Sequence, residues 1–357
     1  MAPFPSQLVN TANISSYFSS FPVRSCELDA LPTIQQALND TIYSCTAPGS
    51  KERKKAEYRH TNPAGNLFGL SFALCEADRL GYVGKLIEFL CIVDEHAIDV
   101  MEDLPFGEAC IEHAILRQAL YENYDDDQYG GRAVGKMKSY LRELRMELAS
   151  LNDPCTPLLL KTLDTSLRDR DSDDSEFQTL AEYIPYRKTN FDYDFVCQLV
   201  RWAMNIPPIV QENLLVRSYE HTVGVIVGLT NDYFSWEMER QQPTDRIRNA
   251  VPVLMKEHSV SEIQAKSMLK EVIIREESKA RELKSEIMNL PEESEQMKRY
   301  VTEMELFAAG YSFCLKRVEQ TRTQYILGAS ANAGKWANII GFSTGSPEVR
   351  GNVDDTL

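Results

Sequence analysis

The chain has 357 residues, 43% of them hydrophobic, and a formal net charge of -15 at pH 7. This length and apolar content suffice for one large domain or two ordinary ones. The negative charge argues against DNA, RNA or an anionic membrane as the main partner, because these need clustered lysine and arginine.

The eight cysteines are spread singly, without a Cys-x-x-Cys pair. That pattern is typical of reduced core thiols and not of a disulfide framework or a zinc site. The N-terminus lacks the basic region and apolar core of a signal peptide, and no apolar run reaches about 18 residues without interruption. We therefore expect a soluble cytoplasmic protein.

The first sixty residues hold proline-punctuated pieces and the basic run 51–55, which we expect to be a solvated loop. From Asn62 onward, apolar residues recur at helical spacing between stretches rich in proline or glycine. No window combines strand-forming composition with hairpin turn signals, so we predict no strand and an all-α fold. Helices are expected at about 81–103, 108–121, 132–151, 156–168, 174–184, 191–204, 208–240, 244–257, 260–289 and 294–325.

The last thirty or so residues differ in composition from the rest. From Gly328 the chain is rich in Gly, Ala, Ser and Asn, and it ends in an acidic tail. Such a segment resembles a linker. We predict one helical domain over residues 1–325 and a linker-like tail over 326–357.

The stretch that begins at Asn231 places three polar side chains on one face of a predicted helix. Asn231, Ser235 and Glu239 are four residues apart, so they follow one another along the axis at intervals of about 6 Å. An amide oxygen, a hydroxyl and a carboxylate in this order suit a hard cation such as Mg²⁺. The preceding run 223–229 is too apolar for the surface. We expect the row to face an interior cavity, although a solvated helix side is the alternative.

A second oxygen-rich segment follows the apolar residues near 90. Glu95, Asp99 and Asp103 repeat every four residues. Like charges at this spacing destabilise a helix by about 0.2–0.5 kcal/mol per pair, and a cation would relieve the repulsion. A solvated helix end is the alternative. We expect His96 to be a bystander, because zinc sites need several His or Cys ligands.

A third element is Arg187, in the stretch Tyr-Ile-Pro-Tyr-Arg-Lys at 183–188. A guanidinium group can bind a phosphate with two parallel hydrogen bonds. A surface arginine at a helix end is an equally good interpretation. Together, two oxygen-rich helix faces and an arginine fit a diphosphate held through Mg²⁺ above an apolar pocket.

These residues also carry a resemblance. The pattern Asn231-Asp232-x-x-Ser235-x-x-x-Glu239 resembles the second metal motif of class I terpene synthases. The residue sequence Asn-Asp-Tyr-Phe-Ser-Trp-Glu is similar to that in the cyclase half of fungal bifunctional terpene synthases. The order of the segments at 62–66, 76–80 and 94–103 also resembles that family. The resemblance covers about residues 60–325.

The resemblance implies a single helical bundle around a central apolar cavity and a cluster of three Mg²⁺ ions. Asp94 matches the first aspartate of the acidic motif, and Glu95 stands where the family usually has a second one. Asp99 fits one form of the third acidic position, whereas the other form would place it at Ile98. The residues with implied catalytic roles are Asp94, Asn231, Ser235, Glu239 and Arg187.

Two positions depart from the family pattern. Met238 stands where related sequences often have a lysine. Members commonly finish with an Arg-Tyr pair that contacts the diphosphate, and no such dipeptide occurs near the end of this chain. Arg322 is the substitute that the resemblance offers for that contact.

The implied reaction is the ionisation and cyclisation of a linear polyprenyl diphosphate, either geranylgeranyl or geranylfarnesyl diphosphate. We also expect a prenyltransferase domain beyond residue 357. A homo-oligomer is a further expectation. Candidate cavity walls are Phe68, Phe72, Phe89 and Trp202. A chain-extending prenyltransferase should show two Asp-rich motifs, and only one is present. The non-enzymatic alternative is an acidic helical scaffold with these carboxylates on its surface.

Overall fold

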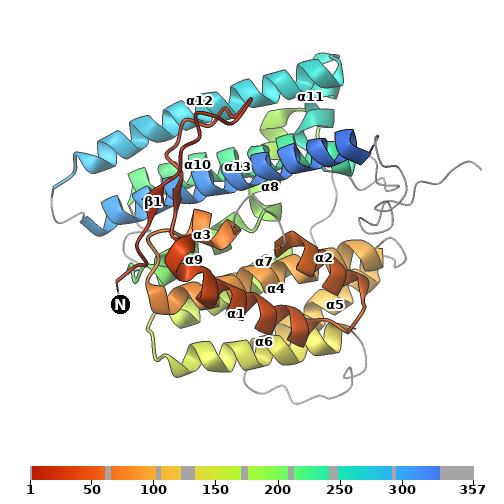
Figure 1. Ribbon diagram of the computed structural model, residues 1–357, viewed down its shortest axis with the longest axis vertical. Coiled ribbons are helices and arrows are strands. Elements are labelled where there is room, and N and C mark those ends of the chain that lie inside the picture. Colours follow the sequence, from red (N-terminus) through yellow and green to blue (C-terminus); the bar gives the residue numbers. More distant parts are fainter. Residues whose placement is uncertain are drawn as a thin grey trace, which may run out of the picture.

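The computed structural model describes residues 2–60, 66–101, 106–121, 133–169, 176–207, 213–240, 248–291 and 295–329. Within them it is almost wholly helical (Figure 1), as the sequence predicted. The helices are α1 Glu27–Cys45, α2 Lys51–His60, α3 Leu67–Ser71, α4 Ala77–Met101, α5 Phe106–Gln118, α6 Ala133–Ser150, α7 Thr156–Asp169, α8 Leu180–Asn190, α9 Tyr193–Ala203, α10 Leu214–Glu239, α11 Ala250–His258, α12 Glu262–Met288 and α13 Glu295–Ala329.

The helices form two groups that α3 and α9 connect. Figure 1 shows α10, α12 and α13 running side by side in the upper part, and these three helices pack on one another. In the lower part α1 lies against both α4 and α6. Between the groups, α3 packs on α1 and α13, while α9 contacts α4, α7, α8 and α13. The two oxygen-rich segments therefore lie in different groups, with α4 below and α10 above.

The prediction of no strand is wrong, because the structure contains one pair of very short strands. Strands β1 (Gln7–Leu8) and β2 (Arg24–Ser25) are antiparallel, with Gln7 opposite Ser25. Nη2 of Arg24 also donates a 2.6 Å hydrogen bond to the carbonyl of Ser6. Strands of two residues are too short to produce an alternating pattern, so the sequence held no signal for them.

The basic run 51–55 is not a loop, because it begins α2. Lysine, arginine and glutamate are good helix formers, and this composition was the missed signal. Arg53 ties the helix to the end of α1, since its Nη2 donates to the carbonyl of Thr46 at 2.6 Å. On one face of α2, the side chain of Ala56 is fully buried. Its contacts with α4 place it beside the acidic segment.

Three helices begin later than the spacing predicted, one of them α11, which starts at Ala250 and not near 244. Helix α8 starts at Leu180, after a capping box in which Thr179 and Glu182 bond to each other's backbone. Helix α10 starts at Leu214, where Oδ1 of Asn213 accepts from two backbone N–H groups. Both caps were readable in the sequence. The helix at the end of the chain continues to Ala329, and the domain boundary at 325 stays a prediction.

Gly310 determines how closely the last long helix approaches α3. A Cβ atom at this position would lie 2.2 Å from the carbonyl oxygen of Leu70. Only glycine therefore allows α13 to lie directly on the backbone of α3. That contact brings Phe68 and Phe72 toward the inner face of α13.

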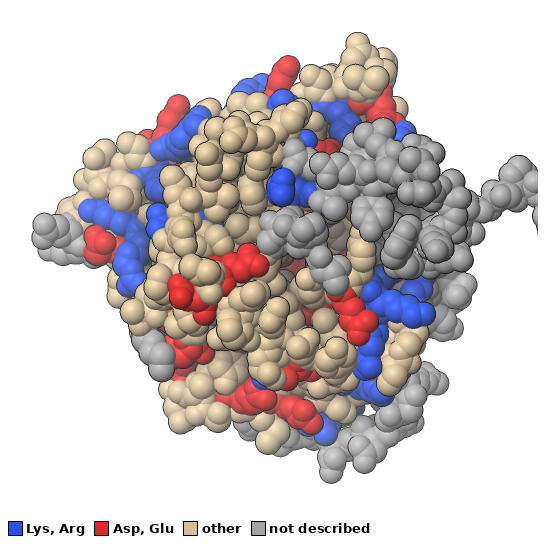
Figure 2. All heavy atoms as spheres, in the orientation of Figure 1, with Lys and Arg blue, Asp and Glu red and all other residues tan. Residues whose placement is uncertain are grey.

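Surface charge, the state of the thiols and the polarity of the helices complete the description of the fold. Basic and acidic side chains are interspersed on the face shown in Figure 2. All eight cysteines are free thiols. Within the described ranges, none of the helices is both long enough and apolar enough to cross a bilayer.

Candidate metal and diphosphate site

Helix α10 carries the predicted row at its C-terminal end. Its middle, residues 222–230, is entirely buried between α12, α13 and α8. Asn231, Ser235 and Glu239 follow as half-buried side chains. The buried middle fixes the helix, and the three oxygen-bearing side chains alternate with buried ones on the half-buried face that follows.

Arg187 lies directly beside this row. Its Nη2 donates a 2.6 Å hydrogen bond to Oδ1 of Asn231, and its Nη1 donates to Oδ1 of Asn190 at 2.6 Å. Nε lies 2.8 Å from Oδ1 of Asp232. Arg187 is only 8% exposed, so the surface-arginine interpretation is wrong. Burial works against its charge and is the largest single influence, but Asp232 together with Tyr183, Glu239 and Tyr311 outweighs it and raises the pKa of Arg187.

Asp232 is the counter-ion that the sequence did not single out. It is fully buried, and its Oδ2 accepts hydrogen bonds from the hydroxyl of Tyr183 at 2.8 Å and from the backbone N–H of Ala250 at 3.0 Å. Burial raises the pKa of Asp232 to about 6, against the opposing effect of Arg187. The residue points away from the row, about 100° around the helix from Asn231. It joins α8, α10 and α11.

Asn249 contacts the other two members of the row. Its Nδ2 lies 2.9 Å from Oε2 of Glu239 and 3.4 Å from Oγ of Ser235, and donates to both. Its Oδ1 accepts from the backbone N–H of Val251 at 2.9 Å, which caps α11. The sequence signal for this residue was an N-cap asparagine before an apolar run. Its contact with the row needed the tertiary structure.

The first member of the row also reaches α13. Nδ2 of Asn231 donates to the hydroxyl of Tyr311 at 2.7 Å. The ring of Tyr311 stacks on Phe307 at 6.2 Å between centroids, and Phe307 meets Phe72 edge-on at 5.5 Å. Phe72 in turn stacks on Phe68 at 6.5 Å. An aromatic series thus runs from α3 to the row.

The other two wall candidates pack elsewhere. Phe89 contacts Tyr140 of α6 at 6.1 Å between ring centroids. Trp202 packs under the guanidinium of Arg79 and donates from Nε1 to Thr156 Oγ1 at 3.1 Å. All four candidates are buried, at 2% exposure or less. Phe68 and Phe72 connect to the row, and the role of all four as cavity walls stays a prediction.

The acidic segment is described only in part. Asp94 lies on α4 and is exposed. The side chains of Glu95, Asp99 and Arg322 lie outside the described residues, as does Asp103. His96 has a structural role here, because its Nε2 lies 2.9 Å from Glu112 of α5 and its Nδ1 3.5 Å from Glu52 of α2; that it is not a metal ligand stays a prediction.

His96 therefore joins three helices beside the acidic motif. Burial alone would lower the pKa of its imidazole. The hydrogen bonds and charges of Glu112 and Glu52 outweigh burial and raise that pKa. An imidazole between two carboxylates ties α4 to α5 and α2 close to Asp94.

The donor chemistry of the row fits a hard cation. One oxygen of each side chain accepts from an N–H group, of Arg187 at Asn231 and of Asn249 at Ser235 and at Oε2 of Glu239. Each of these N–H groups uses a lone pair of the oxygen to which it donates, and a metal ion could bind the same oxygen. In the part of the chain that the structure describes, no cluster of three His, Cys, Asp or Glu could hold a metal. The row itself supplies one carboxylate.

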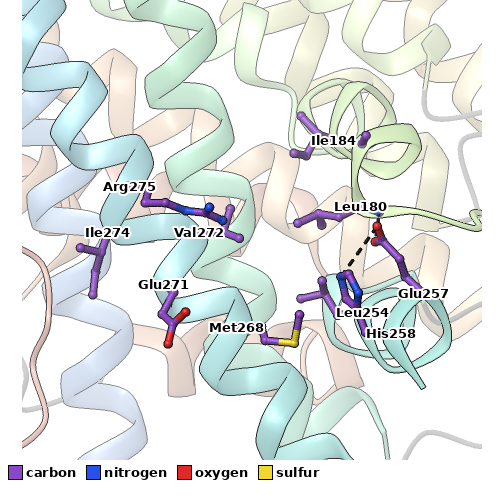
Figure 3. Close-up of a pocket in the computed structure, with 11 residues that line it drawn as sticks. Leu180, Ile184, Leu254, Glu257, His258, Met268, Glu271, Val272, Ile274 and Arg275 are labelled. Atoms are coloured by element: carbon purple, nitrogen blue, oxygen red, sulfur yellow. Dashed lines mark hydrogen bonds and ion pairs between the residues drawn. The ribbon is translucent and has the colours of Figure 1, made fainter. Parts of the chain in front are cut away.

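A separate groove lies between α8, α11 and α12 (Figure 3). It measures about 650 Å³ and is lined mainly by apolar side chains, among them Leu180, Ile184 and Met268. Oε2 of Glu257 accepts the backbone N–H of Leu180 at 2.8 Å there, which holds the start of α8. Neither the row nor the wall candidates line it. We therefore place the candidate site on the inner face of α10 and not in this groove.

Comparisons with known proteins identify the family and the fold. The family model for terpene synthase family 2, C-terminal metal binding, matches residues 85–279, more than half of the chain. The chain is 29% identical over 262 residues to a sesterterpene synthase of Colletotrichum orbiculare, with 70% of this chain and 36% of that protein covered. It is 30% identical over 257 residues to a bifunctional sesterterpene synthase of Talaromyces wortmannii, with 70% and 34% covered.

The chain thus spans about a third of the length of these relatives. Its fold is similar to that of aristolochene synthase from Penicillium roqueforti, with a TM-score of 0.62 and 17% identity over 79% of this chain and 93% of that one. This likeness concerns the fold, whereas the family match also spans both oxygen-rich segments. The chain belongs to the terpene synthase family, with the class I terpene synthase fold.

Proposed function

We propose that this chain is a terpene cyclase that ionises and cyclises a linear polyprenyl diphosphate of 20 or 25 carbons and releases diphosphate. One observation carries the proposal: the buried guanidinium of Arg187 bonds to Asn231, the first oxygen donor of the row. A charged donor beside an oxygen-rich helix face suits an anion held through metal ions. The names of the two relatives, both sesterterpene synthases, support 25 carbons.

The metal-binding residues would come from two helices. Asn231, Ser235 and Glu239 would hold Mg²⁺ from α10, and Asp94 from α4, with Glu95 and Asp99 as further carboxylates. Bound Mg²⁺ supplies Lewis-acid stabilisation of the charge that develops on the departing diphosphate. The family match, described as metal binding, supports a divalent ion at this place. The resemblance to class I synthases is the reason to expect three ions.

Arg187 supplies the fixed positive charge of the site. Its three nitrogens already contact Asp232, Asn190 and Asn231, so the guanidinium is held in one orientation. Preorganised donors of this kind stabilise a leaving anion without reorganising during the reaction. Breakage of the allylic C–O bond leaves the electron pair on the diphosphate oxygen, and no protein nucleophile is required. Arg322 is the candidate for a second diphosphate contact from α13.

The aromatic series would face the carbocation. Each aromatic ring can stabilise a cation by about 0.5–2 kcal/mol. Tyr311 bonds to Asn231, and Phe307 and Phe72 continue the series from Tyr311, which favours these three over Phe89 and Trp202. Loss of a proton to the departed diphosphate would give a hydrocarbon, and capture of water would give an alcohol.

We further propose that residues 326–357 lead to a prenyltransferase domain, that the protein works in the cytoplasm and that it can form homo-oligomers. Support for the second domain comes from the relatives, one of which is named bifunctional and is about three times as long as the matched region. Such a domain would make the allylic diphosphate that this one consumes.

A substrate panel tests the proposal. Purified chain with Mg²⁺ is incubated with farnesyl, geranylgeranyl or geranylfarnesyl diphosphate, and the extract is analysed by gas chromatography and mass spectrometry. We expect cyclic terpene from a 20- or 25-carbon substrate, and none after addition of EDTA. Elongated diphosphates on addition of isopentenyl diphosphate would indicate the chain-extending prenyltransferase instead. No product from any substrate would favour the non-enzymatic scaffold.

A further inference from the structure

We propose that Asn249 is a positioning residue that aims Ser235 and Glu239 at the metal ions. Its amide is 1% exposed and lies between the two side chains, at 3.4 Å from Ser235 Oγ and 2.9 Å from Glu239 Oε2. This inference rests on the proposed function of the row. It adds a residue that lies outside the α10 motif and holds the motif in shape.

The orientation of the amide is fixed from both ends. Oδ1 accepts the backbone N–H of Val251, so the opposite edge, Nδ2, must face α10. Nδ2 also donates to the backbone carbonyl of Asp232 at 3.0 Å. Nδ2 has two N–H groups, so the longest of its three contacts, at 3.4 Å to Ser235 Oγ, shares a hydrogen with another. Rotating the amide by 180° would set its oxygen against the Asp232 carbonyl and the Glu239 carboxylate and leave the Val251 N–H without an acceptor. The side chain therefore cannot turn without losing bonds on both sides.

Glu239 is the ligand that most needs such support. It is the last residue of α10, where the helix has no following turn to restrain it. Its half-buried carboxylate keeps Oε1 and one lone pair of Oε2 for a cation while Asn249 holds the other. Partners of this kind set the orientation of metal ligands, and their loss typically weakens metal affinity by roughly 10- to 100-fold.

The start of α11 is itself fixed to the site. The backbone N–H of Ala250 donates to Oδ2 of Asp232 at 3.0 Å, and Asp232 pairs with Arg187. Asn249 is thus held by the same buried carboxylate that orients the arginine. The diphosphate-facing and metal-facing parts of the site share one support.

Two substitutions separate this role from helix capping. Asn249→Ser keeps an N-cap oxygen but is too short to reach Glu239, whereas Asn249→Ala loses both. Binding of Mg²⁺ in the presence of inorganic diphosphate is measured by isothermal titration calorimetry, and melting temperature by circular dichroism. We expect the Ser variant to be more stable than the Ala variant, and both to bind Mg²⁺ with affinity reduced by roughly 10- to 100-fold.

Asn213→Ser is the matched control. Asn213 caps the other end of α10 through the backbone N–H groups of Leu215 and Val216, far along the helix from the row. The same substitution there should leave Mg²⁺ affinity unchanged. The proposal is overturned if Asn249→Ser binds as tightly as this control, or if affinity follows melting temperature across the variants. Failure of the unchanged chain to bind Mg²⁺ and diphosphate would instead overturn the proposed function, and this inference with it.

Discussion

Nη2 of Arg187 donates a 2.6 Å hydrogen bond to Oδ1 of Asn231, so the candidate phosphate-binding cation and the first candidate metal ligand are one connected unit. The link exists because Gly228, one turn before Asp232, leaves room for the arginine: a Cβ there would lie 3.1 Å from Arg187 Cγ. The carbonyl of Gly228 also accepts from Nε at 3.4 Å. Arg187 thus links α8 to α10 at this point.

Removal of Arg187 should lower both the stability of the protein and its activity, and two variants can separate these effects. Arg187→Ala leaves the carboxylate of Asp232 buried without its cation, which should lower the free energy of unfolding by about 3–5 kcal/mol. The double variant Arg187→Met with Asp232→Asn removes both charges and should recover most of that loss in urea titrations. It should still be at least about 10²-fold slower in releasing diphosphate, because the charged donor is gone. A double variant with wild-type turnover would show that Arg187 is purely structural.

Gly310 should tolerate no side chain. Gly310→Ala places a Cβ 2.2 Å from the carbonyl oxygen of Leu70, a backbone atom that cannot turn aside. We expect a loss of about 1–3 kcal/mol or more in the free energy of unfolding.

The matched control is Gly81→Ala in α4, where the nearest atom, Thr33 Cγ2, is 3.5 Å away. Alanine there should be neutral or stabilise by up to about 1 kcal/mol, because it is the better helix former. Equal effects at the two positions would refute the close approach of α3 and α13.

Glu303 should make stability depend on pH. It is fully buried on α13, with Leu74 N–H at 3.0 Å, and burial raises its pKa to about 8. Because the folded state holds this proton more tightly than the unfolded state, its stabilising contribution is complete below about pH 4.5 and is lost as the pH rises through 8. Glu303→Gln keeps an acceptor for Leu74 and has no proton to lose.

The difference in free energy of unfolding between Glu303→Gln and wild type should therefore grow in favour of the variant from pH 5 to pH 8. At its steepest the slope is about 1.4 kcal/mol per pH unit. Urea titrations at several pH values measure it, and effects of other titrating groups such as Asp232 cancel in the difference. A constant difference would mean that Glu303 is charged in the folded protein.

Tyr311 should tune the row without holding the fold. Tyr311→Phe removes the acceptor for Nδ2 of Asn231, which lies at 2.7 Å. Because both side chains are half-buried, water can replace the hydroxyl, and stability should fall by no more than about 1.5 kcal/mol. The Mg²⁺ concentration needed for half-maximal activity should rise, since Asn231 becomes freer to turn.

Tyr17→Phe is the control for this change. Its hydroxyl donates to the Ala309 carbonyl at 3.5 Å, also on α13 but from the N-terminal segment. The Mg²⁺ requirement should stay the same there. If both variants shift it equally, the contact between Tyr311 and Asn231 has no special role.

The sequence predicted those features that depend on local spacing. The row on α10 followed from residues four apart, and the helical content followed from apolar periodicity. The capping box of Thr179 and Glu182 was equally local, and using it would have corrected the start of α8.

Features that join distant segments could not be read in this way. Asn249 reaches Glu239 only because the chain turns back after α10, and Asp232 is a counter-ion only because α8 brings Arg187 to it. A buried arginine and a surface arginine have the same sequence signature. Burial, and with it the assignment of Arg187, had to come from the packing of the helices.

The most direct test of the central claim is a crystal structure of the chain with Mg²⁺ and inorganic diphosphate. The claim predicts a metal ion at about 2.0–2.1 Å from oxygens of Asn231, Ser235 and Glu239, with a diphosphate oxygen accepting from Arg187. Asp94 should bind a metal ion from the opposite side. A structure in which Mg²⁺ and diphosphate bind elsewhere, and the three oxygens keep only their bonds to Arg187 and Asn249, would contradict it.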